Sequence, residues 1–158
     1  MKFRAAFYRG TQPGVAGIYN RLVRWWTKSP YSHVEMVFGD GWAGSASFTD
    51  GGVRLKRITF DPGKWDFIDL PEHLKPAARA WFDQHAGSPY DLLGNLQFIL
   101  APFGQAEDHW FCSEACAAAL GIIEPGRYDP GTLASALTLI SLQPASAGFS
   151  FESANADR

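Results

Sequence analysis

The chain has 158 residues, of which 46% are hydrophobic and 15% aromatic, and its formal net charge is −2. This length suits a single domain, which can bury roughly 68–70% of the surface of its unfolded chain. The hydrophobic content excludes an intrinsically disordered protein, which needs low hydrophobicity and high net charge. The balanced charge, without a long basic run, argues against binding driven by phosphate contacts, so we expect no nucleic acid partner.

Cysteine content and the length of the apolar runs indicate the compartment. Cys112 and Cys116 are the two cysteines of the sequence, which is far from a disulfide scaffold. A disulfide between positions four apart on a helix would need strained geometry, so we expect two reduced thiols. No run reaches the ~18 apolar residues of a membrane span, and the first ten residues lack the apolar core of a secretion signal. The sequence therefore predicts a cytoplasmic protein, or one that travels inside a larger particle.

The first half of the chain is predicted to consist mostly of strands. Alternating apolar and polar residues, bounded by turn residues, predict strands over residues 3–9, 32–38, 42–48, 53–59 and 65–70. The last four of these are expected to form a β-meander. Apolar residues at helical spacing predict a helix over residues 15–26, between the first two strands.

The second half is predicted to be mainly helical. Apolar spacing and the positions of Gly and Pro predict helices over residues 72–86, 91–100, 112–120 and 131–139. This order of elements is typical of an α+β domain. We expect one domain over residues 1–145 and a polar C-terminal tail over 146–158, which frays as small polar termini do.

Cys112 is the first candidate for chemistry, because it stands where the helix over 112–120 should begin. A helix N-terminus carries partial positive charge and free backbone N–H groups, which favour the reactive thiolate and can bind a developing oxyanion. A buried structural cysteine is the alternative, since free cysteine is among the most buried residue types. Cys116, one turn further on among alanines, is expected to be part of the core.

His33 is the candidate base, because a cysteine nucleophile needs one and histidine is the usual choice. Glu35 lies two residues further along the same predicted strand, so both side chains project from one face of the sheet. The carboxylate could orient the ring. Ser45 or Ser47, on the predicted neighbouring strand, could do the same. A solvated strand face is the alternative interpretation.

A zinc site is an alternative role for the cysteines. His109, Cys112 and Cys116 lie close together in the sequence, and His33 or Glu114 could supply a fourth ligand. Structural zinc sites, however, usually have their ligands in compact pairs with defined spacing, and this cluster matches poorly. We therefore expect neither a metal nor another cofactor.

Several motifs together resemble a known family. Ser29–Glu35 (SPYSHVE) resembles the S-x-Y-S-H-V segment of circularly permuted NlpC-like cysteine hydrolases, which include a YiiX-type branch and relatives of lecithin retinol acyltransferase. Gly87–Asp91 resembles the G-x-x-Y-D segment of that family, and Phe111–Glu114 resembles its F/Y-C-S-E nucleophile motif. Asp50–Arg54 resembles the turn after the histidine strand, especially in phage-encoded members. The likeness extends from about residue 6 to about residue 137.

The resemblance implies a permuted papain-like (NlpC-like) α+β fold, in which an antiparallel β-meander or small barrel packs against the helix with the cysteine. It implies that Cys112 is the nucleophile and His33 the base. The family's third residue is usually polar and on the next strand, but residues 42–47 contain no His, Glu, Asp or Gln. Ser45, Ser47 or Glu35 could take that place, and we favour Glu35. The remaining residues expected to line the site are Tyr31, Tyr90, Trp110 and Ser113.

The predicted function is a cysteine hydrolase or acyl-transfer enzyme acting on an amide or ester, with a cell-wall peptide, a lipid ester or a protein isopeptide as substrate. One alternative is a non-catalytic, phage-associated structural or binding protein that keeps the fold, which would place it in a virion. Another is a lipid acyltransferase or thioesterase at a membrane surface. Trp25 and Trp26, beside Arg21, Arg24 and Lys28, suit an interface. Because such aromatic residues are more often core, we expect the two tryptophans to be buried.

Overall fold

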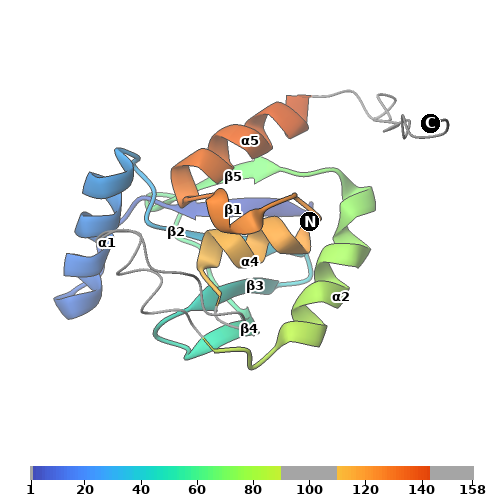
Figure 1. Ribbon diagram of the computed structural model, residues 1–158, viewed down its shortest axis with the longest axis horizontal. Coiled ribbons are helices and arrows are strands. Elements are labelled where there is room, and N and C mark those ends of the chain that lie inside the picture. Colours follow the sequence, from blue (N-terminus) through green and yellow to red (C-terminus); the bar gives the residue numbers. More distant parts are fainter. Residues whose placement is uncertain (1, 90–109, 143–158) are drawn as a thin grey trace, which may run out of the picture.

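A computed structural model of the protein describes residues 2–89 and 110–142. Within them the chain forms an α+β fold with one antiparallel sheet and four α-helices (Figure 1). The strands are β1 (Arg4–Tyr8), β2 (His33–Val37), β3 (Trp42–Ser47), β4 (Gly52–Arg57) and β5 (Trp65–Asp69). The helices are α1 (Gly14–Thr27), α2 (Lys75–His85), α4 (Cys112–Ala119) and α5 (Pro130–Leu142), with short 3-10 turns η1 (Glu72–Leu74) and η2 (Pro125–Arg127).

The order of the strands in the sheet is β4-β3-β2-β1-β5, and every neighbouring pair is antiparallel. The predicted meander is therefore correct for β2, β3 and β4 but wrong for β5, which lies beside β1 at the opposite edge. Trp65 of β5 is paired with Tyr8 of β1, and their rings pack with centroids 4.9 Å apart. Aromatic pairs of this kind stabilise a cross-strand pairing. With β4 and β5 as its edges, the sheet is open and is not a small barrel.

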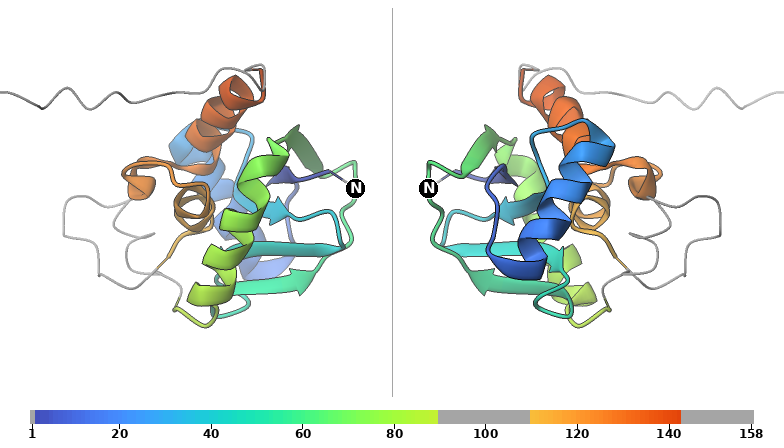
Figure 2. Two further views of the ribbon diagram at one scale, coloured as in Figure 1. Left: turned by 90° about the vertical axis from the view of Figure 1, so that its right-hand side faces the viewer. Right: turned by 90° about the vertical axis from the view of Figure 1, so that its left-hand side faces the viewer.

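The core lies between one face of the sheet and the helices α2 and α4. Phe7, Val34 and Met36 project from the central strands toward these helices, and each is fully buried. Helix α4 packs on β2 and β3, and α2 packs on β4 and on α4 (Figures 1 and 2). At Gly44 of β3, a Cβ atom would come within 2.7 Å of the Phe82 ring. Glycine is therefore needed there for α2 to approach the sheet.

The predicted helices in the described residues are confirmed, with boundaries that differ by a few residues. The prediction over 72–86 corresponds to η1 followed by α2. The predicted helix over 91–100 and the tail over 146–158 lie outside the described residues. Across residues 2–89 and 110–142, none of the helices has the length and apolar character that crossing a membrane requires.

Helix α1 departs from the expectation that its tryptophans are core. Trp25 and Trp26 are both exposed, and the buried residues of the helix are Gly17 and Asn20. Polar contacts attach α1 to the loop that precedes it: Nη1 of Arg24 donates to the carbonyl oxygens of Arg9, at 2.5 Å, and Gly10, at 2.7 Å. These hydrogen bonds tie α1 to the loop before it, while its two tryptophans remain exposed.

Candidate active site

Cys112 is the first residue of α4, as the sequence predicts. The residue before it, Phe111, has an extended backbone, and the Ala-rich segment that follows favours a helix. The Cys112 side chain is buried in the packed structure but also lines a pocket, so it lies between the core and a space that a ligand can enter. The N–H groups of the first turn have no partner inside the helix and point toward this end.

His33 is the first residue of β2, and its side chain meets Cys112 despite their distance along the chain. Burial disfavours the charged ring and lowers its pKa. The Cys112 sulfur, by its charge and by a side-chain hydrogen bond, and the Glu35 carboxylate together outweigh burial and raise the pKa of His33 from 6.5 to about 9. The ring is therefore held in its protonated form at neutral pH, beside the sulfur.

Glu35 holds the opposite side of the ring. Nε2 of His33 lies 2.8 Å from Oε1 of Glu35, which leaves Nδ1 as the ring nitrogen available to the sulfur. The contact confirms that the two side chains share a face of β2, as the two-residue period of a strand requires. Burial alone would raise the pKa of Glu35, but hydrogen bonds from Arg54 and His33 hold it below its usual value.

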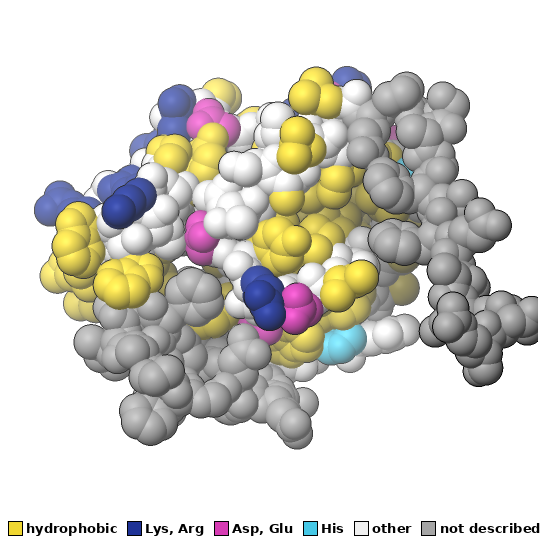
Figure 3. Space-filling model, turned by 45° about the horizontal axis from the view of Figure 1, so that its top comes forward, with side chains coloured by type: hydrophobic (Ala, Val, Ile, Leu, Met, Phe, Trp, Pro, Cys, Tyr) yellow, Lys and Arg dark blue, Asp and Glu magenta, His cyan; other side chains and the backbone are white. Residues whose placement is uncertain are grey.

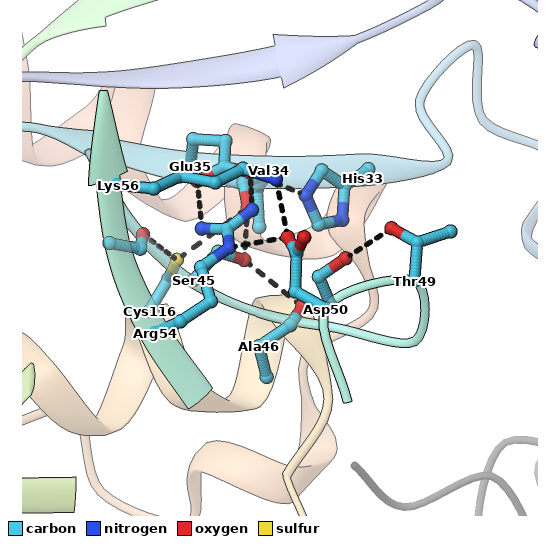
Figure 4. A network of polar contacts seen from close by, with 12 residues as sticks. His33, Val34, Glu35, Ser45, Ala46, Thr49, Asp50, Arg54, Lys56 and Cys116 are labelled. Atoms are coloured by element: carbon cyan, nitrogen blue, oxygen red, sulfur yellow. Dashed lines mark hydrogen bonds and ion pairs between the residues drawn. The ribbon is translucent and has the colours of Figure 1, made fainter. Parts of the chain in front are cut away.

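Arg54 of β4 completes this network, and sequence reasoning assigned it no role (Figure 4). Its guanidinium contacts both carboxylate oxygens of Glu35, with Nη1 2.6 Å from Oε2, while its Nε lies 2.8 Å from Oδ2 of Asp50. Asp50 also accepts a hydrogen bond from Lys56. Ser45, which is paired with Arg54 across β3 and β4, is small enough for the guanidinium to reach past it to β2. A buried carboxylate needs a positively charged partner. A search of the neighbouring strands for a basic residue to pair with Glu35 could have identified Arg54.

The serines considered as third members have other partners. The Ser45 hydroxyl donates to the carbonyl oxygen of Val34 at 2.7 Å. The Ser47 hydroxyl lies 3.0 Å from that of Thr49. The two serines are thus engaged with β2 backbone and with the β3–β4 turn, whereas Glu35 contacts the imidazole directly.

Cys116 lies one helical turn after Cys112 and has different surroundings. It is fully buried, and its sulfur faces the carbonyl oxygens of Val34, at 3.9 Å, and Gly44, at 4.0 Å. Burial raises the pKa of the Cys116 thiol well above its ordinary value, and the charges of Cys112 and Glu35 add to the effect. The prediction that Cys116 belongs to the core is confirmed.

Two neighbouring pockets lie at the candidate site. One includes Cys112 in its wall, and the other includes His33. Tyr19 of α1 and Ser32, the residue before β2, line both pockets. Ser32 is buried, and among the described residues its hydroxyl oxygen has no hydrogen-bond partner. The pocket at Cys112 and the pocket at His33 are therefore adjacent.

The residues predicted to line the site are distributed more widely. Ser113 lines the same pocket as Cys112. Trp110 instead packs edge-to-face against Trp81 of α2, with ring centroids 4.9 Å apart. Tyr31 lines a different pocket, and its hydroxyl group lies 3.1 Å from the Asp66 carboxylate. Tyr90 lies outside the described residues.

The described residues contain no group of three or more His, Cys, Asp or Glu side chains arranged to hold a metal ion. His109, one member of the zinc set considered from the sequence, lies outside them. None of the family models, curated proteins and solved structures with which the chain was compared matches it.

Proposed function

We propose that this chain is a cysteine hydrolase or acyltransferase of the permuted papain-like type, with Cys112 as nucleophile, His33 as general base and acid, and Glu35 as the residue that orients His33. The observation that carries the proposal is the chain of contacts from Cys112 at the start of α4 through His33 to Glu35, with Nε2 and Oε1 2.8 Å apart. The order of a histidine strand followed by a cysteine helix supports the permuted arrangement.

The chemistry begins with a thiolate and an imidazolium. The Cys112 sulfur attacks the carbonyl carbon of an amide or ester, and its electron pair forms the C–S bond while the C=O π electrons move to oxygen. Backbone N–H groups at the start of α4 can stabilise this oxyanion. Ser32 lines both pockets, and its hydroxyl oxygen has no hydrogen-bond partner among the described residues, so it is a candidate further donor.

The tetrahedral intermediate then collapses and the bond to the leaving amine or alcohol breaks. His33 gives its proton to that leaving group, and a thioester on Cys112 remains. Water, or a second amine or alcohol, next attacks the thioester. His33 takes the proton of this nucleophile, and the thiolate–imidazolium pair is restored. The adjacent pockets at Cys112 and at His33 provide space for a substrate beside each of the two residues.

Thiol alkylation tests the proposal without knowledge of the substrate. At pH 6–7, we expect iodoacetamide to modify Cys112 at least about 100-fold faster than Cys116, because an adjacent imidazolium favours the thiolate. Peptide mass spectrometry reads each site separately, and the Cys112→Ser variant serves as the control. Equal and slow labelling of both residues would favour the non-catalytic alternative.

A further inference from the structure

Helix α1 presents apolar side chains to solvent along its outer face. Five residues at helical spacing form this apolar stripe: Val15 (79% exposed), Ile18 (61%), Leu22 (46%), Trp25 (73%) and Trp26 (44%). The right-hand view of Figure 2 shows α1 lying across the outside of the molecule. A contiguous apolar surface of this kind on a folded domain marks an interaction site.

The side of α1 that packs on the molecule is small and polar, because its buried residues are Gly17 and Asn20. An ordinary amphipathic surface helix has the reverse arrangement, with its apolar face buried and its polar face in solvent. At one edge of the apolar face, Tyr19, Val23 and Trp26 line the pocket that contains Cys112. Trp26 belongs to both the stripe and the pocket, so whatever covers the stripe also lies at the edge of the candidate active site.

The charges beside the stripe are positive. Residues 14–27 contain no Asp or Glu, and Arg21 and Lys28 are exposed. In Figure 3, apolar side chains and basic side chains lie next to each other over α1, at the left. Two copies of the chain joined through this face would bring like charges together, whereas a surface of anionic headgroups over an apolar layer complements both features.

We propose that α1 is an interfacial helix that docks the protein on an anionic lipid bilayer, with the apolar stripe among the acyl chains and with Arg21 and Lys28 at the headgroups. Trp26, which also lines the Cys112 pocket, then lies at the membrane. Docking at this face implies that substrates are taken from the bilayer surface. This implication rests on the proposed function, whereas the docking itself does not.

Vesicle binding tests the docking on Cys112→Ala protein, in which chemistry plays no part. We expect this protein to sediment with phosphatidylcholine/phosphatidylglycerol vesicles and to bind pure phosphatidylcholine vesicles more weakly. The variant Ile18→Ser/Trp25→Ser should lower the partition coefficient by about tenfold for each side chain removed. Arg21→Glu/Lys28→Glu should lower it by at least about fivefold for each cation, on the anionic vesicles only.

The matched control is Leu139→Ser/Leu142→Ser, which removes two exposed leucines from α5 and should leave binding unchanged. Brominated lipids should quench wild-type tryptophan fluorescence, and the Trp25→Phe/Trp26→Phe variant should lose most of this quenching. Absence of sedimentation with anionic vesicles, equal loss in the α5 control, or a concentration-dependent dimer that the α1 substitutions dissociate would overturn the proposal. If instead vesicles bind but Cys112 labels slowly, docking stands and the proposed function fails.

Discussion

The first and second turns of α4 place two cysteines in contrasting environments. Cys112 and Cys116 lie on one helix, four positions apart, and both are buried. Cys112 meets an imidazole whose pKa is raised to about 9, whereas Cys116 faces two backbone carbonyl oxygens. A carbonyl oxygen stabilises a thiol and disfavours a thiolate, while an imidazolium does the opposite. The two cysteines therefore differ in the group that faces the sulfur, and not in whether they are buried.

Replacing each cysteine in turn by alanine should give the largest difference between the two positions. Cys112→Ala should lower turnover by at least about 10⁴-fold on any substrate found, because the covalent step is lost. Cys116→Ala should leave turnover within about twofold and cost about 1 kcal/mol of unfolding free energy, as a small change in a packed core. Steady-state kinetics and urea denaturation measure the two effects. Equal losses of activity would point to a structural or metal-binding role for both residues.

Substitution of Glu35 tests what makes His33 different from an ordinary histidine. Glu35→Gln should reduce turnover by about 10²- to 10⁴-fold, because the ring loses the carboxylate that orients it and stabilises its charge. The pKa of His33 should fall below about 9, since Glu35 is among the groups that raise it. NMR titration of the His33 ring measures this shift.

Ser45→Ala and Ser47→Ala are the matched controls for the Glu35 substitution. Their hydroxyls bond to Val34 and Thr49, so we expect the His33 titration to stay as in the wild type. An unchanged pKa in Glu35→Gln, together with a shift in either serine variant, would overturn the assignment of the third residue.

Removal of Arg54 tests whether the site depends on the support behind Glu35. Arg54→Met leaves Glu35 buried without its guanidinium, and breaking a buried pair in this way costs about 3–5 kcal/mol of unfolding free energy. Lys56→Met, on the same strand, removes an exposed partner of Asp50 and should cost no more than about 1 kcal/mol. Urea denaturation at pH 7 compares the two. Similar small losses would mean that Arg54 does not sustain the buried carboxylate.

The pH dependence gives the smallest and most specific test. Because His33 has a folded-state pKa of about 9, above its ordinary 6.5, its proton is retained through neutral pH and is lost as the pH rises through about 9. Turnover should therefore fall on the alkaline side with a midpoint near 9, whereas the stability contributed by the charged ring should already decline from pH 6.5 and be lost by about pH 9. In Cys112→Ala, the NMR titration of His33 should move toward lower pH, because the sulfur no longer favours the imidazolium. A midpoint near 6.5 in the wild type would contradict the raised pKa of His33.

Local patterns were sufficient for the parts of the site that lie within one element. The two-residue period of a strand places His33 and Glu35 on one face, and their contact follows from that period alone. Likewise, the helix-forming residues after Phe111 are enough to place Cys112 at a helix start. These predictions needed no information about which elements pack together, since each depends only on neighbours in the chain.

Tertiary structure decided everything that joins distant segments. The meeting of Cys112 with His33 depends on α4 packing against β2, and the support of Glu35 depends on a guanidinium that reaches across β3 from β4. The same holds for β5, whose alternating pattern indicates a strand but does not specify β1 as its partner. The exposure of Trp25 also depends on tertiary structure. An apolar helical face in the sequence predicts that this face is covered, but only the packed structure shows that the sheet does not cover it.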